Sequence, residues 1–510
     1  LSESRIIEKR AINILSKILN KHHNINFNKK QWKIILGHWL RCYIRVFSNR
    51  YLHLSKILNT KKIDYFNYTK DSNSTNNNEI KNFIEKIKDD NFNDEIYQKI
   101  ILFKKKKISI KVKKTKTNNS SQERFGLLNL FNLFSLKNEK IFISELYLSK
   151  IGNILLHLRL KIAPRFWSCV NFTKYSSLNS NLRIELNKKV KPKKINLDSF
   201  LLSNIFEYMP KAYLEDFNNI SKFVKDKFPK KPEIIVTANS FFFNETFKNF
   251  VAQNYKQSIY CVQQHGNNYQ SHYDEHFESI EEDTAHFFLS WFKKRNSKKY
   301  IETCMQKSIK KKKINDNLLI LHWPFDQRDK IWDNFDEYSN YINKTKILLK
   351  KISSLTHVKK IDYRVSHNHN NIDNLLYFKK ISKKIDFDFS KLTFNESVNN
   401  SKIALFTYNS SGFYENLSNN IPSLMIIDKT YLKELNKETK YDFKELIKFN
   451  LVFTDINKLL NFLKQNWNSI DEWWMSGASQ DNIKKFVDKN AIRSNNIIKT
   501  LSSKIKNLAK

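Results

Sequence analysis

Two segments of the chain each place an apolar run, a helix and a second apolar run in succession. In the first, residues 233–240 (EIIVTANS) lead through a helical stretch to residues 258–266 (SIYCVQQHG). In the second, residues 402–412 (KIALFTYNSSG) lead through a helical stretch to residues 421–428 (IPSLMIID). A strand, a helix and a strand in this order form a βαβ unit with two parallel strands. The sequence therefore predicts an α/β protein with two Rossmann-like domains.

Glycine is scarce in this chain, which narrows the kinds of α/β protein it can be. Only 6 of the 510 residues are glycine, and no two of them lie close together. A Walker A loop needs the pattern G-x-x-x-x-G-K, and the dinucleotide fingerprint needs G-x-G. Neither occurs, which argues against P-loop NTPases and standard NAD-binding proteins. The 4 cysteines lack C-x-x-C spacing, which argues against zinc fingers and disulfide frameworks and suits a reducing cytoplasm.

The order of these patterns also predicts a domain division. We expect an N-terminal α/β domain over residues 1–300, with helices through its first 60 residues, and a basic linker over 301–317. A second Rossmann-like domain is expected over 318–475, followed by helices over 476–510 that pack back on the N-terminal domain. No apolar run approaches the ~20 residues that a transmembrane helix needs.

The chain is strongly basic, with 90 Lys and Arg against 50 Asp and Glu and a formal net charge of +40. Three explanations remain open: a solvated surface rich in lysine through coding bias, attraction to an anionic membrane or polyanionic substrate, and nucleic-acid binding. Lysine greatly outnumbers arginine, and base readout depends largely on arginine. The composition therefore favours the first two explanations over the third.

Polar clusters follow three of the predicted strands, where ligands bind in open parallel sheets. The cluster over residues 408–412 is the best phosphate site, because Ser410 and Ser411 offer hydroxyls and Gly412 lets a ligand approach the backbone. The helix that follows directs free N–H groups and its positive end at an anion. A plain helix N-cap is the alternative explanation of these serines.

The other two clusters contain a histidine and a carboxylate. His265 follows an apolar strand and can act as a general acid or base or hold an oxyanion, and Glu245 lies near the end of the preceding strand. Sugar transfer passes through an oxocarbenium-like state that a carboxylate stabilises. A Glu245–His265 pair across adjacent strand ends is therefore a candidate active site. The alternatives are a hydrogen-bonded strand-end histidine and an acidic residue that favours a helix N-terminus.

Metal binding has weaker support in the sequence. Residues 386–388 (DFD) form an Asp-x-Asp triplet, a pattern that often occurs by chance. Two histidine pairs, His272 with His276 and His367 with His369, lack the three or four ligands at recognised spacing that a site requires. We expect no metal and no separate cofactor.

Four motifs together resemble one family. They are QHGNNY at 264–269, YNSSGFYENLSNNIPSLMI at 408–427, ILGHWLRCYIRVFSNRY at 35–51 and a stretch that begins NSIDEWW at 468–480. The chain resembles the bacterial surface-carbohydrate transferases associated with O-antigen clusters, over nearly its whole length. That family resembles two-domain GT-B glycosyltransferases of the capsule and Kdo transferase type, with two Rossmann-like domains facing each other across a cleft.

The resemblance implies roles for particular residues. The C-terminal domain would bind the nucleotide-sugar donor through Asn409, Ser410, Ser411, Gly412, Glu415 and Arg364. The N-terminal domain would face the acceptor and line the cleft with Asn239, Ser240, Gln264, Gly266 and Asn267, beside the catalytic candidates Glu245 and His265.

The function that follows is transfer of a sugar from a nucleotide-activated donor onto a lipid-linked or growing cell-surface polysaccharide. We expect the enzyme to work in the cytoplasm, at the cytoplasmic face of the inner membrane, where its basic charge would be attracted to anionic lipid. Two alternatives stay open: a transferase of polyol phosphate from a CDP-linked donor, and a basic nucleic-acid-binding protein.

Overall fold

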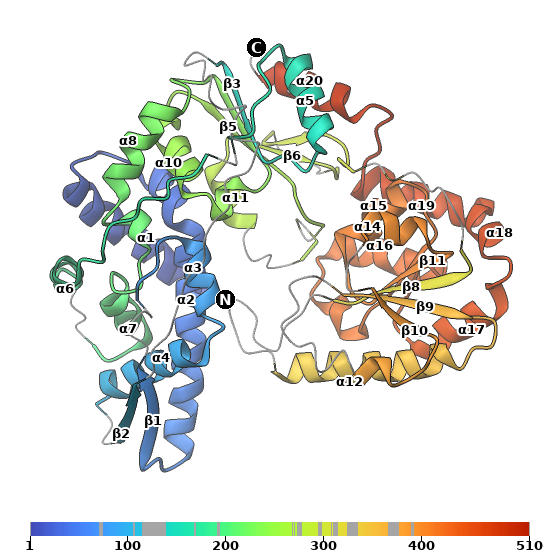
Figure 1. The fold of residues 1–510 in the computed structure, drawn as a ribbon, viewed down its shortest axis with the longest axis horizontal. Helices are drawn as coiled ribbons and strands as arrows, with labels where there is room; N and C mark the ends of the chain where they lie inside the picture. Colours follow the sequence, from blue (N-terminus) through green and yellow to red (C-terminus); the bar gives the residue numbers. More distant parts are fainter. Residues whose placement is uncertain are drawn as a thin grey trace.

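The chain folds into two α/β domains, each built on a parallel sheet (Figure 1). The computed structural model describes residues 2–70, 75–105, 108–114, 139–167, 170–190, 194–267, 269, 271–272, 278–293, 298–307, 309, 315–323, 335–365, 377–388 and 392–508. Both βαβ units expected from the sequence are present, and the predicted α/β class with two Rossmann-like domains is confirmed.

The N-terminal domain contains a five-stranded sheet whose strands follow one another in sequence order, all parallel. The strands are β3 (Ile141–Ser144), β4 (Ile234–Thr237), β5 (Ile259–Gln263), β6 (Phe287–Ser290) and β7 (Tyr300–Glu302). The interior strands are buried along almost their whole length, as expected for a parallel sheet covered on both faces. Strand β7 includes the first residues of the expected 301–317 linker.

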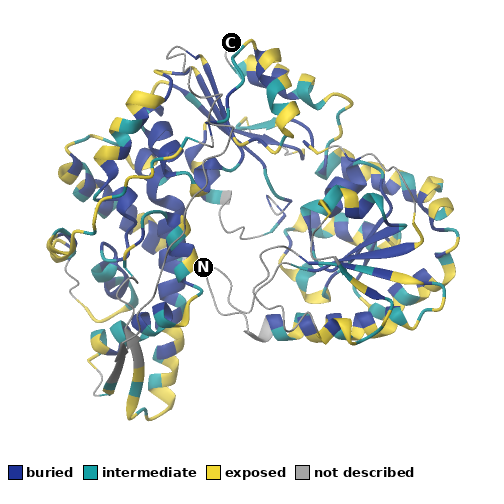
Figure 2. Ribbon diagram, in the orientation of Figure 1, coloured by how far each residue is buried: buried dark blue, intermediate teal, exposed yellow. Residues whose placement is uncertain are grey.

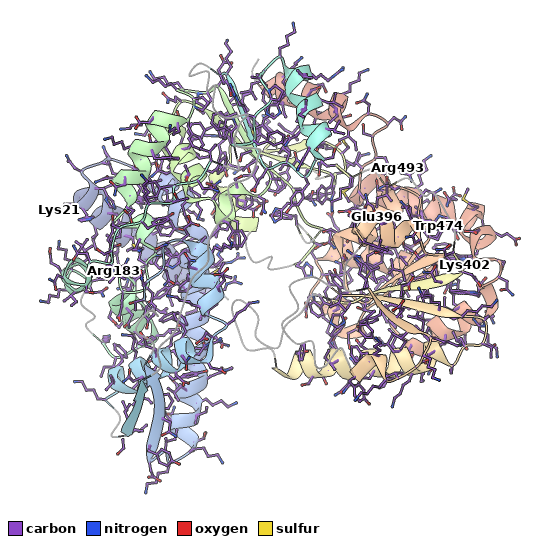
Figure 3. The ribbon with its side chains drawn as sticks, in the orientation of Figure 1. Lys21, Arg183, Glu396, Lys402, Trp474 and Arg493 are labelled. Atoms are coloured by element: carbon purple, nitrogen blue, oxygen red, sulfur yellow. The ribbon has the colours of Figure 1, made fainter. Side chains whose placement is uncertain are left out.

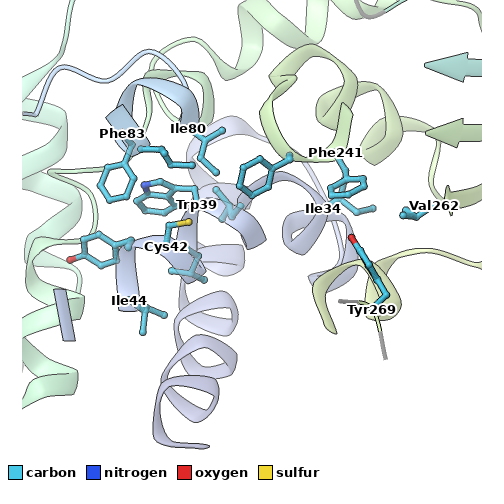
Figure 4. Packing of buried hydrophobic residues seen from close by; sticks show 14 of the residues in the cluster. Ile34, Trp39, Cys42, Ile44, Ile80, Phe83, Phe241, Val262 and Tyr269 are labelled. Atoms are coloured by element: carbon cyan, nitrogen blue, oxygen red, sulfur yellow. The ribbon is translucent and has the colours of Figure 1, made fainter. Parts of the chain in front are cut away.

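A long helix, α2 (Lys29–Thr60), organises the helical part of this domain. It begins at a capping box between Asn28 and Gln31 and contacts α1 (Ser2–His23) along its length. It also contacts α10 (Glu245–Asn254) and α11 (Glu278–Thr284), so that most of its side chains are buried. Figure 4 shows Trp39 beside Phe83 at one end of the shared core and Phe241 beside Ile34 toward the sheet. The helices expected in the first 60 residues are therefore packed within their own domain.

Shorter elements complete the N-terminal domain. They are β1 (Tyr65–Lys70), α3 (Ile80–Lys86), α4 (Asp90–Phe103), β2 (Ser109–Lys114), α5 (Lys150–Leu160), α6 (Ser180–Lys188), α7 (Leu197–Asn204), α8 (Phe217–Lys227) and α9 (Ser240–Phe243). Strands β1 and β2 pair in parallel at the end of the domain far from the main sheet (Figure 1).

The C-terminal domain has the doubly wound order of a Rossmann fold. Its strands are β8 (Asn317–Leu321), β9 (Lys360–Arg364), β10 (Ile385–Asp388), β11 (Ile403–Phe406), β12 (Ser423–Ile426) and β13 (Val452–Phe453). They are all parallel and lie in the order β10-β9-β8-β11-β12-β13. Successive strands are added on one side from β8 to β10 and on the other side from β11 to β13, so the order of addition switches between β8 and β11. Ligands bind at such a switch point, outside the carboxyl ends of the strands.

Helices cover both faces of this second sheet (Figure 2). They are α12 (Phe335–Ser353), α14 (Phe394–Asn399), α15 (Ser411–Ser418), α16 (Lys437–Lys448), α17 (Ile456–Asn466), α18 (Ile470–Met475) and α19 (Gly477–Asn490). Helix α19 contacts α15, α16 and α18, whereas the last helix, α20 (Ile497–Leu508), contacts α5 of the N-terminal domain. Residues 476–510, expected to form helices that pack back on the N-terminal domain, thus include one helix against each domain. In the segment between α19 and α20, Arg493 donates a hydrogen bond to the backbone oxygen of Ser418 at the end of α15 (Figure 3).

In the part of the chain that the structure describes, none of the helices combines the length and the apolar character needed to span a membrane.

Candidate functional site

A cavity of about 290 Å³ lies at the carboxyl ends of β8, β9 and β11, at the switch point of the C-terminal domain. Its lining includes Arg364, Ser410, Ser411, Gly412 and Glu415. Five of the six residues expected to bind the donor therefore meet in one pocket. The remaining lining residues are Lys307, Leu321, His322, Val365, Phe394 and Tyr408.

The N-terminus of α15 forms one wall of the pocket. The Ser410 side chain is its N-cap and accepts a hydrogen bond from the backbone N–H of Gly412 at 3.2 Å. Gly412 is needed for packing, because a Cβ there would lie 2.8 Å from Phe394 Cζ and 3.0 Å from Phe406 Cε1. We expected this glycine to admit a ligand to the backbone; the structure shows that two aromatic rings occupy the space beside it. The cap and the half-buried N-terminus of α15 still line the pocket and suit an anion.

Glu415 lies one turn into α15 and is buried. Burial raises the pKa of its carboxyl group, and the ion pair with Lys307, whose Nζ lies 3.0 Å from Oε1, acts in the opposite direction. Its second oxygen, Oε2, has no hydrogen-bond partner among the residues that the structure describes, so it can accept a hydrogen bond from a ligand hydroxyl. Lys307 was missed by the sequence reasoning because it falls in the segment expected to be a basic linker.

Arg364 is the last residue of β9 and is fixed at the edge of the pocket. Its Nη1 donates to the backbone oxygen of Leu392 at 2.9 Å and to Ser397 Oγ at 2.7 Å. These bonds tie the end of β9 to α14 and to the segment before it, with Arg364 in the lining of the cavity.

His265 comes from the other domain, two residues after β5 ends. Its Nδ1 lies 2.8 Å from the hydroxyl of Tyr269, and that hydroxyl donates to Glu281 Oε2 at 2.5 Å. The ring is stacked on Tyr147, with centroids 6.2 Å apart, and lies beside Phe241. Burial among these groups lowers the pKa of His265 to about 4, which keeps the imidazole neutral at pH 7.

The two domains are joined where these two sites approach each other. Asn267, two residues after His265, donates its backbone N–H to Ser411 Oγ at 3.1 Å and its side-chain amide to Asn409 Oδ1 at 2.8 Å. The Asn409 amide donates to the Tyr431 hydroxyl at 2.8 Å, which is 2.9 Å from His272 Nε2. Asn409 therefore acts in the domain interface rather than in the pocket wall.

Glu245 does not face His265. It begins α10 and is buried, with Oε2 2.8 Å from Lys248 Nζ. Its Oε1 accepts hydrogen bonds from the Tyr213 hydroxyl at 2.9 Å and from the backbone N–H of Ile80 at 3.1 Å. All these partners belong to the helical layer, so the structure does not form the Glu245–His265 pair that we expected from strand ends.

Besides Glu281, Glu145 is a carboxylate on the His265 side of the cleft, and it directly follows β3. It has a left-handed backbone with a φ of 48°, unusual for a residue other than glycine and more frequent at functional sites. Its Oε2 accepts a hydrogen bond from Ser240 Oγ at 3.0 Å. Burial is the main cause that raises the pKa of the nearby Tyr147, and the negative charge of Glu145 raises it further. The sequence carried a signal for it, since Glu145 follows the apolar run IFIS.

The remaining cleft residues shape the loop around His265. Gln264 is buried, donates to the backbone oxygen of Gly266 at 2.8 Å and accepts from the backbone N–H of Trp291 at 3.1 Å. A Cβ on Gly266 would lie 4.0 Å from Ser411 Oγ, which places this glycine beside the α15 end. Asn239 is half-buried at the start of α9.

Within the described ranges, no three His, Cys, Asp or Glu side chains are grouped so that they could hold a metal ion. Asp386, from the Asp-x-Asp triplet, lies on the edge strand β10 with a carboxylate oxygen 3.4 Å from Lys360 Nζ. The Asp388 side chain, His276, His367 and His369 lie outside the described residues.

The switch-point pocket of one Rossmann-like domain thus lies against the histidine-bearing loop of a second α/β domain. The model of the LIC12162 family transferases matches residues 2–505. The chain therefore belongs to the LIC12162 family of transferases, and the assignment to a transferase family made from its motifs is confirmed. None of the curated proteins compared with the chain matches it.

Several solved structures are distantly similar to this chain. MurG from Acinetobacter baumannii is 8% identical at a TM-score of 0.34, with 69% of this chain and 98% of MurG covered. The wall teichoic acid polymerase TagF is 12% identical at a TM-score of 0.36, with 75% and 92% covered. The spinosyn rhamnosyltransferase SpnG is 7% identical at a TM-score of 0.34, with 73% and 100% covered. Likenesses this distant support no statement about the activity of this chain.

Proposed function

We propose that this transferase moves a sugar from a nucleotide-activated donor onto a lipid-linked or growing cell-surface polysaccharide. The observation that carries the proposal is the hydrogen bond between Asn267 and Ser411. It brings the loop of His265 directly against the helix end that lines the switch-point pocket. A donor in the pocket would thus present its reactive end to the histidine-bearing domain.

The pocket supplies what a nucleotide sugar needs. The N-terminus of α15, with the Ser410 and Ser411 hydroxyls, suits the donor phosphates, and Arg364 and Lys307 add positive charge around them. Glu415 Oε2, which has no partner in the described part of the chain, suits a ribose hydroxyl. Together these groups would stabilise the negative charge that develops on the departing nucleotide phosphate. No metal or separate cofactor is part of this proposal.

The proposed chemistry begins with His265 as a neutral base. Because the Tyr269 hydroxyl donates to Glu281, His265 Nδ1–H donates to the Tyr269 oxygen and Nε2 keeps its lone pair. Nε2 takes the proton of an acceptor hydroxyl as that oxygen bonds to the anomeric carbon of the sugar. The bond from that carbon to the donor phosphate oxygen breaks, and its electron pair leaves with the nucleotide. Glu145 would stabilise the positive charge on the imidazole and on the sugar ring.

The acceptor side of the proposal rests on charge and position. A net charge of +40 favours an anionic environment, and we propose that the enzyme works at the cytoplasmic face of the inner membrane. A lipid-linked acceptor would reach the cleft from that surface.

Isothermal titration calorimetry with CMP, CDP, UDP and GDP tests the donor site. We expect one nucleotide to bind, with affinity reduced about tenfold by Ser411→Ala, since a hydrogen bond to a charged group contributes about 1.5–3 kcal/mol. Binding of a short RNA with a steep salt dependence and of no nucleotide would instead support the nucleic-acid alternative. With the donor base known, product analysis separates a glycosidic bond from the phosphodiester that a CDP-linked polyol donor would give.

A further inference from the structure

Helix α5 exposes a stripe of large apolar side chains. Ile151, Leu155 and Leu158 are 70%, 49% and 58% exposed. Their spacing of four and then three residues places them on one face of the helix. The opposite face buries Leu156 and Leu160 against the core of the N-terminal sheet. The stripe is therefore not needed to attach α5 to its own domain.

Helix α20 lies against α5 and extends this surface. A Cβ on Gly152 would lie 3.8 Å from Ile498 Cδ1, and Arg159 Nε donates to Ser502 Oγ at 3.1 Å. Neither helix contains an Asp or a Glu. The basic residues of the two helices and of the position after α5 are Lys150, Arg159, Lys161, Lys499, Lys504 and Lys506. We call this surface, the stripe with its flanking basic residues, the α5–α20 face.

The α5–α20 face begins at the rim of the candidate site. The loop before α5 carries Glu145 and Tyr147, and the Tyr147 ring is stacked on His265. Ile151, the first residue of the stripe, is one helical turn further along the chain. In Figure 1, α5 and α20 lie together at the top of the N-terminal domain, and exposed residues appear on their outer side in Figure 2.

We infer that the α5–α20 face docks on an anionic lipid surface. Exposed leucine and isoleucine side chains flanked by lysine and arginine, with no acidic residue, form the pattern of a helix that lies in the membrane interface. The apolar stripe enters the acyl boundary, while the long basic side chains reach the head groups. Delivery of a lipid-linked acceptor to the cleft rests on the proposed function, but docking itself does not.

Co-sedimentation with lipid vesicles tests the inference on the full chain. The probes are vesicles of phosphatidylcholine alone and of phosphatidylcholine mixed with phosphatidylglycerol. We expect the chain to bind the mixed vesicles more tightly. The variant Ile151→Gln/Leu155→Gln/Leu158→Gln should bind them at least about tenfold more weakly, since each inserted side chain and each basic residue adds to the partition.

Helices α2 and α4 of the same domain offer a matched control surface. Leu52, Ile57 and Leu102 are 56%, 45% and 60% exposed on α2 and α4, and Leu52→Gln/Ile57→Gln/Leu102→Gln should bind vesicles like the parent chain. Equal melting temperatures would show that both variants are folded. Parental binding by the α5 variant, or loss of binding in the control variant instead, would overturn the inference.

Two further measurements separate the alternatives. If the parent chain ignores vesicles and sedimentation velocity shows an oligomer that the α5 variant dissociates, the face binds protein and the inference is wrong. Nucleotide calorimetry on the same samples reports on the proposed function alone. Vesicle binding without nucleotide binding would remove the proposed function and leave the docking surface standing.

Discussion

Asn267 and Ser411 belong to different domains and are joined by two hydrogen bonds. The Asn267 backbone N–H donates to Ser411 Oγ at 3.1 Å, and Ser411 Oγ donates to Asn267 Oδ1 at 3.2 Å. Ser411 is also the first residue of α15, whose N-terminus lines the pocket. The hydroxyl that takes part in this contact between the domains is thus also the one that a donor phosphate would contact, so donor binding and domain alignment should be coupled.

This coupling predicts different effects for the two residues. Ser411→Ala removes the shared hydroxyl and should weaken nucleotide binding about tenfold. Asn267→Ala keeps the backbone bond but loses the side-chain bonds to Ser411 and Asn409. It should leave nucleotide affinity within about twofold and lower kcat, because the His265 loop is aligned less well on the donor. Calorimetry and steady-state kinetics measure the two effects, and equal losses of affinity would contradict this difference by showing that the Asn267 side chain also serves nucleotide binding.

His265 should be required for turnover. Replacing it with Asn should lower kcat by about 10²- to 10⁴-fold with little change in nucleotide affinity, the range for loss of a general base. Because the pKa of His265 is lowered to about 4, kcat/KM of the parent chain should be flat near neutral pH and fall as pH drops toward that value, where the imidazole binds a proton.

Tyr269→Phe provides a separate test of how His265 is oriented. Its hydroxyl holds Nδ1 at 2.8 Å, and without it kcat should fall about tenfold while KM stays unchanged. A change in KM alone would show that Tyr269 serves binding rather than the orientation of the base.

Glu245 should matter for stability rather than for chemistry. Its carboxylate and the Lys248 ammonium are both almost completely buried and 2.8 Å apart. Glu245→Ala leaves a buried ammonium without its counter-charge, and such a change typically costs about 3–5 kcal/mol of unfolding free energy. The double variant Glu245→Leu/Lys248→Met should be less destabilised than the sum of the two single variants, because it removes both charges. Additive losses in urea denaturation would contradict this coupling.

Glu245 and Glu415 show which features of the site could be predicted from the sequence and which could not. Strand–helix–strand patterns predicted β4, α10 and β5 and put polar residues at their ends, because hydrophobic periodicity is a local property of the chain. Whether Glu245 faces the sheet edge or the helical layer depends on α2, α3 and α8, which lie elsewhere in the sequence. The same limit applied to Lys307, whose partner Glu415 is brought beside it by tertiary packing alone.

The switch-point pocket was more predictable because most of the residues expected there share one local pattern. Ser410, Ser411, Gly412 and Glu415 follow β11 and open α15, so their proximity to one another was fixed by the helix itself. Arg364 joined them because β9 and β11 both flank β8 in a parallel sheet, and their carboxyl ends meet at one edge.

Acid should destabilise the protein through its buried histidines. Burial lowers the pKa of His23, which is 5% exposed, from 6.5 to about 4. Between these values the unfolded chain binds more protons than the folded chain, so stability is full above pH 6.5 and falls as pH drops toward 4. The loss from this histidine should be on the order of 3 kcal/mol.

Thermal melts of His23→Gln across this range measure the effect. The slope of stability against pH should be shallower in this variant than in the parent chain, whereas His53→Gln, a change at an exposed histidine on α2, should leave it unchanged. Equal slopes in all three proteins would show that His23 does not report on folding.

Gly412→Ala should destabilise the C-terminal domain by steric overlap. The added Cβ would lie 2.8 Å from Phe394 Cζ and 3.0 Å from Phe406 Cε1, and overpacking of this kind typically costs about 1–3 kcal/mol. Gly477, the first residue of α19, is the matched control, because a Cβ there meets nothing within 4 Å. Gly477→Ala should therefore be neutral or slightly stabilising. The double variant Gly412→Ala/Phe394→Leu should recover part of the loss in unfolding free energy, since the smaller side chain removes the nearest contact. Equal stability of Gly412→Ala and Gly477→Ala would mean that the aromatic pair moves freely and that the glycine is not required for packing.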